Sequence, residues 1–357
     1  MTADPSKQQQ PSRRSILKSA AAGAIAIAAA PSILTAMKTD SNSLVVGTGR
    51  HTYEVIDNWA KRPADKPWGD THMVQEVGDG RIFICHNGPE SVHIYDPDGK
   101  FITSWGDDMK GAAHGMDLRK ENGEEFLYFS PTGQHRVIKT NLKGEKVFEL
   151  GYPKDAKGPN GETCYQGGNA KYVPTFIAFA PGDNGDFYVT DGYGSNYVHR
   201  YNIKGEYQST FGGTGDKEGQ LKCPHGIWCD TRDPNNPVIV VADRSNVRLQ
   251  FFTMDGKFIK IVKDELRAPC HFDQQGTDLL IPDLHGRVTI FDKENKLVTH
   301  LCDNTDPAKR GNHGVKPAEL TPGQFCTPHG AIWDRAGNIY VTEWLPYGRV
   351  TKLRHIA

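Results

Sequence analysis

The chain has 357 residues, with 42 Lys and Arg against 43 Asp and Glu, which gives a formal net charge of −1. No basic stripe or Arg-rich tract follows the N-terminus, so the sequence excludes the charged surface typical of nucleic-acid-binding proteins. The 38 Gly and 22 Pro residues, together with 10% aromatic residues and no long apolar helical pattern, predict a turn-rich, all-β protein.

Residues 1–36 have the pattern of an export signal. Arg13 and Arg14 stand shortly before residues 16–18, Ile-Leu-Lys, and a small-residue apolar run covers residues 20–30. That run is too short and too rich in alanine to span a bilayer. The paired arginines resemble a twin-arginine translocation signal. We therefore expect a periplasmic or extracellular protein with no membrane span after signal removal; an ordinary secretory signal or an uncleaved anchor is the alternative.

A repeating pattern of four short strands joined by tight turns fills the rest of the chain. In the clearest copy, residues 224–262, strands are predicted at residues 226–230, 238–242, 247–252 and 257–262. Similar units cover residues 73–106, 115–151, 175–212 and 270–301, and a last unit, residues 327–356, has three strands.

The last unit lacks one strand, and residues 52–59 form a strand-like segment that belongs to no repeat. We predict that this segment supplies the missing outer strand and closes a ring of sheets through the two ends of the chain. Residues 51–357 are thus predicted to form a six-bladed β-propeller, an architecture that leaves only short, protected sheet edges. Residues 37–50 are predicted to be a linker.

A His-Gly step opens every second repeat, at His114, His225 and His329. Equivalent positions in a closed ring converge on its axis, so we expect three neutral imidazoles to meet there and to hold a metal with an open coordination position. Zinc is the expected metal, and another divalent metal is the alternative. In the alternative interpretation, Pro-His-Gly is only a frequent strand-start pattern whose histidines bind backbone groups.

Other side chains near the expected axis have simpler interpretations. His72 opens the first repeat, either as a fourth ring histidine or exposed to solvent, and is interpreted as a non-ligand. Thr175 and Cys270 fill two further ring positions. The chain has seven cysteines, an odd number, and no CxxC spacing occurs among them, which argues against a zinc ribbon. We interpret these cysteines as buried thiols rather than metal ligands. Five other possible metal ligands are interpreted as ordinary residues near a turn or a blade start. They are His86, His271, His285, Cys223 and Cys326.

Residues 328–342, with Pro-His-Gly, a strand and Asn-Ile-Tyr-Val-Thr, resemble the NHL repeat. Residues 241–250 and residues 190–193 resemble matching blades of the peptidyl-α-hydroxyglycine α-amidating lyase family. That resemblance implies a six-bladed propeller whose catalytic zinc is held by one histidine from each alternate blade. On the same resemblance, the zinc ligands are His114, His225 and His329, the general base is Tyr193, and the anchor for the substrate carboxylate is Arg244.

The chain departs from this family at several positions. Asn87 stands where the family has a second substrate-binding arginine, and Gly330 stands where it has an aspartate that serves a structural calcium. The cysteines of the family's disulfides have no counterparts at Gly194 or Val240. The resemblance therefore implies a retained metal site, whereas the substrate clamp and the calcium site are in doubt.

We expect an exported metal-dependent enzyme, similar to the amidating lyase, that acts on a small-molecule or peptide substrate bearing a hydroxyl and a carboxylate. The alternative is a non-catalytic propeller that binds a peptide, glycan or protein; Arg244 would then pair with Asp191 or Asp243, and Tyr193 would pack over the axis. A calcium-dependent lactonase-like hydrolase is disfavoured, because calcium sites use oxygen ligands and this ring is rich in histidine.

Overall fold

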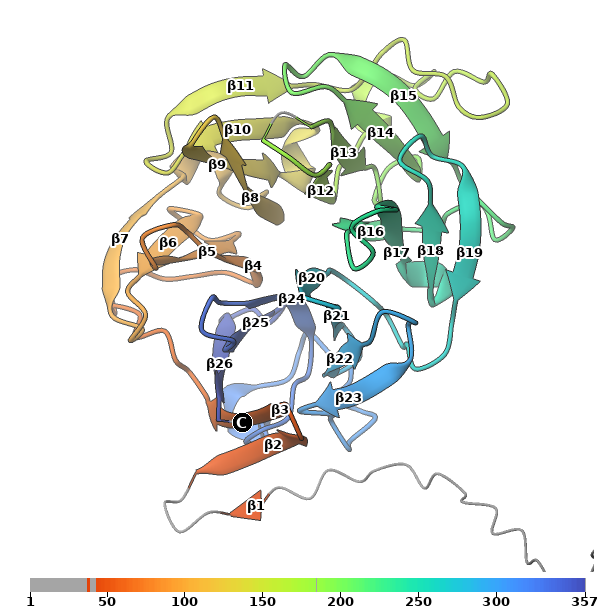
Figure 1. Ribbon diagram of the computed structural model, residues 1–357. Coiled ribbons are helices and arrows are strands. Elements are labelled where there is room, and N and C mark those ends of the chain that lie inside the picture. Colours follow the sequence, from red (N-terminus) through yellow and green to blue (C-terminus); the bar gives the residue numbers. More distant parts are fainter. Residues whose placement is uncertain (1–36, 39–42, 184, 357) are drawn as a thin grey trace, which may run out of the picture. The chain divides into compact units, whose positions relative to one another are not determined.

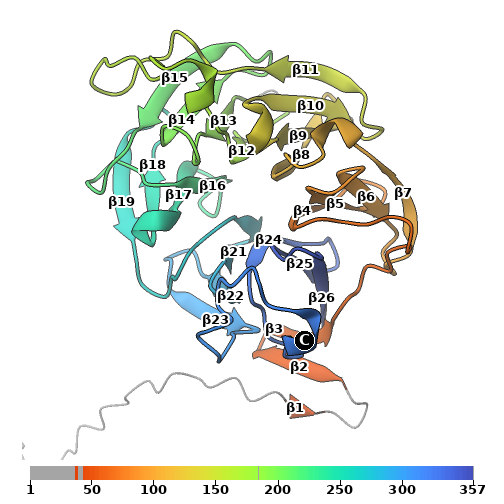
Figure 2. The ribbon, with the colours of Figure 1, turned by 180° about the vertical axis from the view of Figure 1, so that it is seen from behind.

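The computed structural model describes residues 37–38, 43–183 and 185–356. These residues form six antiparallel sheets arranged as blades around a central axis (Figures 1 and 2). The predicted all-β six-bladed propeller is confirmed. The predicted export signal, residues 1–36, lies outside the described residues.

In blades 1 to 5 the strands follow one another in chain order, and the first strand of each blade lies nearest to the axis (Figure 1). Blades 1 and 2 consist of β4 (Thr71–Glu76), β5 (Ile82–His86), β6 (Val92–Tyr95) and β7 (Phe101–Trp105), and of β8 (Gly115–Glu121), β9 (Glu124–Ser130), β10 (Val137–Asn141) and β11 (Lys146–Leu150). Blade 3 consists of β12 (Phe176–Phe179), β13 (Phe187–Thr190), β14 (Tyr197–Tyr201) and β15 (Tyr207–Gly212). Blade 4 consists of β16 (Pro224–Asp230), β17 (Val238–Asp243), β18 (Arg248–Phe252) and β19 (Phe258–Val262). Blade 5 consists of β20 (Asp273–Gln275), β21 (Asp278–Asp283), β22 (Arg287–Phe291) and β23 (Leu297–Leu301).

Blade 6 combines the two ends of the described chain. Its sheet has the order β1-β2-β3-β26-β25-β24, formed by β24 (Pro328–Trp333), β25 (Ile339–Glu343), β26 (Arg349–His355), β3 (His51–Ile56), β2 (Leu44–Thr48) and β1 (Met37–Lys38). Strand β3 pairs with β26 from Lys352 opposite Ile56 to His355 opposite Tyr53, so ring closure by an N-terminal strand is confirmed. Residues 37–50, predicted to be a linker, instead contain β1 and β2, because β2 pairs along the free edge of β3.

The middle strands of each blade are buried on both faces, because each sheet packs between two neighbouring sheets. In blade 4 every residue of β18 is buried and β17 is buried from its second residue, whereas β19, at the outer edge, is mostly exposed or half-buried. This explains why apolar residues run continuously through β17, from Val238 to Ala242, rather than alternating with polar ones.

The described helices are short 3₁₀ turns: η1 (Asp107–Met109), η2 (Thr132–Gln134), η3 (Asn169–Lys171), η4 (Arg244–Asn246) and η5 (Pro317–Glu319). None of the described helices has the length and apolar character needed to cross a bilayer. The two longest connections join adjacent blades: residues 151–175 lie between β11 and β12, and residues 302–327 lie between β23 and β24.

Candidate functional site

The ring residues stand at the start of the innermost strand of each blade. In blades 1, 4 and 6 the pairing with the second strand shifts register around the ring histidine, between Thr71 and Met73, between Pro224 and Ile227, and between Pro328 and Gly330. Such a bulge frees one residue from regular pairing and re-aims its side chain. The side chains of His72, His225 and His329 reach the axis in this way.

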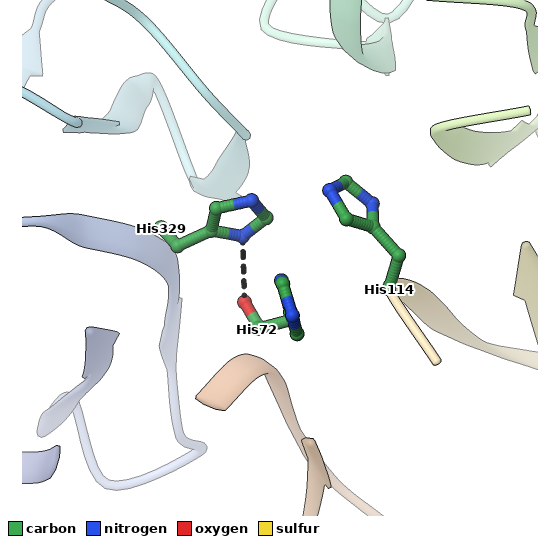
Figure 3. Close-up of side chains that lie close together, drawn as sticks. All are labelled: His72, His114 and His329. Carbon is green, nitrogen blue, oxygen red and sulfur yellow. Dashed lines mark hydrogen bonds between the residues drawn. The ribbon is translucent and has the colours of Figure 1, made fainter. Parts of the chain in front are cut away.

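The imidazoles of His72, His114, His225 and His329 converge at the axis. Ring centroids lie 4.7–4.9 Å apart for five of their pairs, and the Nε2 atoms of His114 and His225 lie 3.2 Å apart. Potential ligand atoms of His72, His114 and His329 lie within 4.8 Å of one another (Figure 3). We call these four residues the histidine cluster, and this cluster can bind a metal.

Backbone carbonyls fix the orientation of the three predicted ligands. His114 Nδ1 lies 3.0 Å from the carbonyl oxygen of Thr175, His225 Nδ1 lies 2.8 Å from that of Cys270, and His329 Nδ1 lies 3.1 Å from that of His72. Each acceptor is the ring residue of the following blade. A carbonyl only accepts, so Nδ1 carries the hydrogen and Nε2 presents a lone pair, which is the arrangement found around metal-binding histidines.

The glycine that follows each of these histidines makes room for the same carbonyl. A Cβ atom on Gly115, Gly226 or Gly330 would lie 2.4, 2.3 or 2.4 Å from the carbonyl oxygen of the neighbouring ring residue. A side chain at these positions would therefore push the next blade away from the histidine. At Gly330 the Cβ would also lie 2.7 Å from Met73 Sδ, so the family's calcium-binding aspartate does not fit here.

Burial keeps the cluster neutral. Loss of hydration lowers the pKa of His114 to about 4 and lowers the pKa of His72, His225 and His329 well below the usual value. All four side chains are therefore uncharged at neutral pH and offer lone pairs to a cation.

His72 differs from the other three members of the cluster. It is 5% exposed, and its Nδ1 atom is buried without a hydrogen-bond partner among the described residues. Its carbonyl oxygen accepts from His329 and from Thr342 Oγ1, at 2.9 Å. The sequence favoured His72 as a non-ligand, but the structure places it inside the cluster. Its Nδ1 atom, which lacks a hydrogen-bond partner among the described residues, is a fourth candidate ligand.

Tyr193 links the cluster to Arg244. The Tyr193 hydroxyl lies 3.3 Å from His114 Nε2, 3.0 Å from His225 Nε2 and 3.3 Å from an Arg244 terminal nitrogen. Although 43% of the Tyr193 surface is exposed, its hydroxyl contacts three side chains of the site. Burial raises the pKa of Tyr193 to about 12, and the neighbouring Arg244 guanidinium opposes this shift.

The Arg244 guanidinium has no carboxylate partner among the described residues. It contacts Cys223 Sγ at 3.3 Å and Cys270 Sγ at 3.8 Å, and it lies 5.4 Å from the centre of the Tyr193 ring. Asp243 instead pairs with Arg248 at 2.6 Å, which contradicts the alternative in which Asp243 neutralises Arg244. A guanidinium left unpaired beside the cluster is suited to bind an anion.

The other alternative partner, Asp191, shapes the turn that carries Tyr193. It accepts hydrogen bonds from the backbone of Val173 at 2.6 Å and Ser195 at 2.7 Å, and from the Tyr165 hydroxyl at 2.9 Å. Asp191 therefore caps this turn. Burial raises the pKa of Asp191 to about 7.

Glu343, the last residue of β25, is fully buried in blade 6. It accepts from the backbone of Cys326 and Thr327 and pairs with Arg349 at 2.6 Å. All seven cysteines are free, and all except the half-buried Cys223 are buried, as predicted for thiols that pack in the core.

Asn87 and the other histidines near the turns take no part in the cluster. Asn87 binds Asp70 through both ends of its amide, at 2.9 and 3.0 Å. His86 stacks edge-on against His93 at 4.4 Å, and His271 packs against Phe176 at 4.4 Å. His285 is exposed in the turn between β21 and β22.

Relatives by sequence include proteins named as amidating lyases. The chain is 26% identical over 278 residues to peptidyl-alpha-hydroxyglycine alpha-amidating lyase 1 of Drosophila melanogaster, covering 72% of this chain and 47% of the fly protein. It is 25% identical over 167 residues to a probable lyase of the same name from Caenorhabditis elegans, covering 46% and 43%. The chain thus spans about half the length of the fly protein. The resemblance predicted from the sequence is confirmed, and no protein-family model matches the chain.

Solved structures share the fold. A streptogramin B lyase superposes with a TM-score of 0.56 at 14% identity, covering 84% of this chain and 97% of that one. A gluconolactonase from Xanthomonas campestris superposes with a TM-score of 0.55 at 14% identity, covering 88% and 90%. At this identity the likeness establishes the propeller fold alone.

Proposed function

We propose that the chain is an exported metal-dependent lyase that cleaves a carbon–nitrogen bond in an N-acyl-α-hydroxyglycine, a substrate class that includes peptidyl-α-hydroxyglycines. The relatives of this chain support the class of reaction. The observation that most supports this proposal is the Arg244 guanidinium without a carboxylate partner. It contacts the Tyr193 hydroxyl, which in turn contacts two histidines of the cluster. An anion-binding group, a proton acceptor and a cation site therefore adjoin one another.

The donor set fits a divalent cation. His114, His225 and His329 would hold it through Nε2, and His72 adds a fourth buried imidazole beside them. Zinc suits neutral imidazoles, although the same ligands accept other first-row metals. When bound, such a cation supplies Lewis-acid polarisation of a substrate oxygen.

The protein groups have separate tasks in this proposal. Arg244 binds the substrate carboxylate through its planar guanidinium and so places the hydroxyl-bearing carbon beside Tyr193. The deprotonated Tyr193 oxygen takes the proton of the substrate hydroxyl, and a positive charge at the adjacent cluster favours this phenolate form.

The electron pair of the O–H bond then forms the C=O bond of glyoxylate, and the C–N bond breaks. The nitrogen keeps that bonding pair and gains one hydrogen, which gives a primary amide. The hydrogen lost from oxygen balances the hydrogen gained by nitrogen, so the reaction needs no co-reactant.

The test combines metal analysis with an assay of glyoxylate release from a peptidyl-α-hydroxyglycine. We expect stoichiometric divalent metal and turnover. In Tyr193→Phe we expect kcat to fall by about 10²- to 10⁴-fold with metal content unchanged, because only the proton acceptor is removed. In Arg244→Gln we expect mainly a higher KM, since each charged hydrogen bond lost costs about 1.5–3 kcal/mol. Protein without metal that gains none on titration would sink the proposal and favour a binding scaffold.

A further inference from the structure

The connection between blades 5 and 6, residues 302–327, brings a histidine to the rim of the ring. His313 Nε2 lies 2.6 Å from Asp70 Oδ1, and Asp70 stands two residues before His72 of the cluster. The His313 ring stacks on Trp344 with centroids 4.1 Å apart and an interplanar angle of 29°. We call Asp70, His313 and Trp344 the rim triad.

The rim triad is held in place from several sides. Asn87, at the position of the family's second arginine, fixes Asp70 through its side-chain amide at 2.9 Å and accepts from the Asp70 backbone at 3.0 Å. The Tyr347 hydroxyl donates to the carbonyl of Val315, two residues beyond His313, at 3.0 Å. Asn87 thus supports an acidic residue instead of supplying a positive charge.

Trp344 lies at the same rim as the cluster. Its backbone N–H donates to the carbonyl of Thr327 at 2.9 Å, and its carbonyl accepts from the Thr327 hydroxyl at 2.8 Å, immediately before the strand that carries His329. The rim triad belongs to the border of blades 6 and 1, whereas Tyr193 and Arg244 come from blades 3 and 4, on the other side of the ring.

In the neutral form of His313, the Asp70 carboxylate, which only accepts, fixes the imidazole hydrogen on Nε2. The Nδ1 atom then presents a lone pair, and it has no hydrogen-bond partner in the part of the chain that the structure describes. The side chain is 36% exposed, so this lone pair is accessible. It matches a neutral N–H donor and offers nothing to a carboxylate.

We infer that His313 is a specificity-determining residue that accepts a hydrogen bond, through Nδ1, from the amide N–H of an N-acylated substrate. This inference rests on the proposed function: with the carboxylate at Arg244 and the hydroxyl at the cluster, the amide and its acyl group extend toward the rim triad. The site thereby selects acylated α-hydroxyglycines over simple α-hydroxy acids and over ester isosteres that lack the N–H.

Binding of two unreactive probes to the purified, zinc-loaded protein tests this inference. N-benzoylglycine and its ester isostere O-benzoylglycolate share the carboxylate and the ring and differ in the N–H. We expect the wild type to bind the amide about fivefold more tightly, the effect of one neutral hydrogen bond. His313→Ala should weaken the amide to the level of the ester and leave the ester unchanged. Asp70→Asn should reduce the preference too, because the tautomer is no longer fixed.

Two further variants separate the outcomes. His355→Ala, whose ring binds the backbone of Arg50 on the outer edge of blade 6, should keep the wild-type preference. Arg244→Gln should weaken both probes equally. The inference is overturned if His313→Ala retains the preference or if it weakens both probes alike. If the wild type binds neither probe, the proposed function fails and this inference fails with it.

Discussion

His225 Nδ1 lies 2.8 Å from the carbonyl oxygen of Cys270, and a Cβ atom on the next residue, Gly226, would lie 2.3 Å from the same oxygen. The imidazole is therefore oriented by a neighbouring blade that approaches only because glycine follows the histidine. The same relationship recurs at His114 and His329. The His-Gly step is thus one structural unit: the glycine admits the carbonyl, and the carbonyl turns Nε2 toward the axis.

Gly226→Ala should therefore damage both stability and the cluster. We expect the free energy of unfolding to fall by about 1–3 kcal/mol, the usual range for inserting a methyl group into a packed interior. Urea denaturation of the metal-free protein measures this. Gly151→Ala is the matched control, because a Cβ there would meet no atom within 4 Å. Equal stability of the two variants would contradict the packing role of Gly226.

Removal of a cluster histidine should weaken metal binding. For His225→Ala we expect zinc affinity to fall by more than about 100-fold, beyond the 10- to 100-fold typical for loss of an outer-shell partner. Competition with a chromophoric chelator measures the affinity. His72→Ala tests the fourth imidazole: a measurable loss supports ligation, and wild-type affinity would restrict the ligand set to the three alternate blades. His355→Ala, at the end of β26 and outside the cluster, serves as control.

The metal-free protein should lose stability as the pH falls from about 6.5 to about 4. Burial lowers the pKa of His114 to about 4, and the unfolded value is about 6.5. Between these values the unfolded chain binds a proton that the folded chain does not, so the free energy of unfolding falls by roughly 1.4 kcal/mol per pH unit for each such histidine. Histidines with a similarly lowered pKa are His72, His86, His93, His199, His225, His271 and His329.

Buried carboxyls oppose this trend. The pKa values of Asp191 and Asp273 are raised to about 7, so the folded chain holds these protons at pH values where the unfolded chain has lost them. Asp191→Asn should therefore steepen the decline between pH 6.5 and 4. Urea denaturation at several pH values measures both effects, and stability that stays level or rises on acidification would contradict the assignment of neutral buried imidazoles.

Ring closure predicts a difference between two truncations. A protein that begins at residue 43 keeps β2 and β3, whereas one that begins at residue 57 loses the strand that pairs with β26. We expect the shorter protein to melt at a clearly lower temperature, because Tyr53 leaves the core of blade 6 and the edge of β26 becomes unpaired. Identical melting of the two truncated proteins would mean that the ring does not depend on β3.

The sequence predicted the blades well, because short strands and tight turns repeat at regular spacing. The boundaries of β17 and β18 differ from the predicted ones by one residue at one end each. The convergence of His114, His225 and His329 was equally predictable, since a repeat in a closed ring has one position nearest to the axis. Strands β1 and β2 were not predictable, because only pairing with the exposed edge of β3 makes those residues a strand.

The sequence left open whether His72 would join the other ring histidines. His72 lacks the following glycine that marks the other three, and its place depends on the bulge around Thr71 and Met73. The position of His313 depends on the path of a long connection without strand pattern, which no periodicity reveals. The sequence did contain one relevant sign, the Asn87 that replaces an arginine, although it did not indicate that Asp70 would be the partner.

The bond between His329 and the carbonyl of His72 joins residues 257 positions apart. A growing chain therefore cannot assemble the histidine cluster until its last blade has been synthesised and has met the first. If the cluster holds a metal, loading would come after synthesis of the whole propeller, in whichever compartment the finished ring first meets the ion. The choice of metal would then depend on when and where the ring closes, as well as on the affinity of the imidazoles.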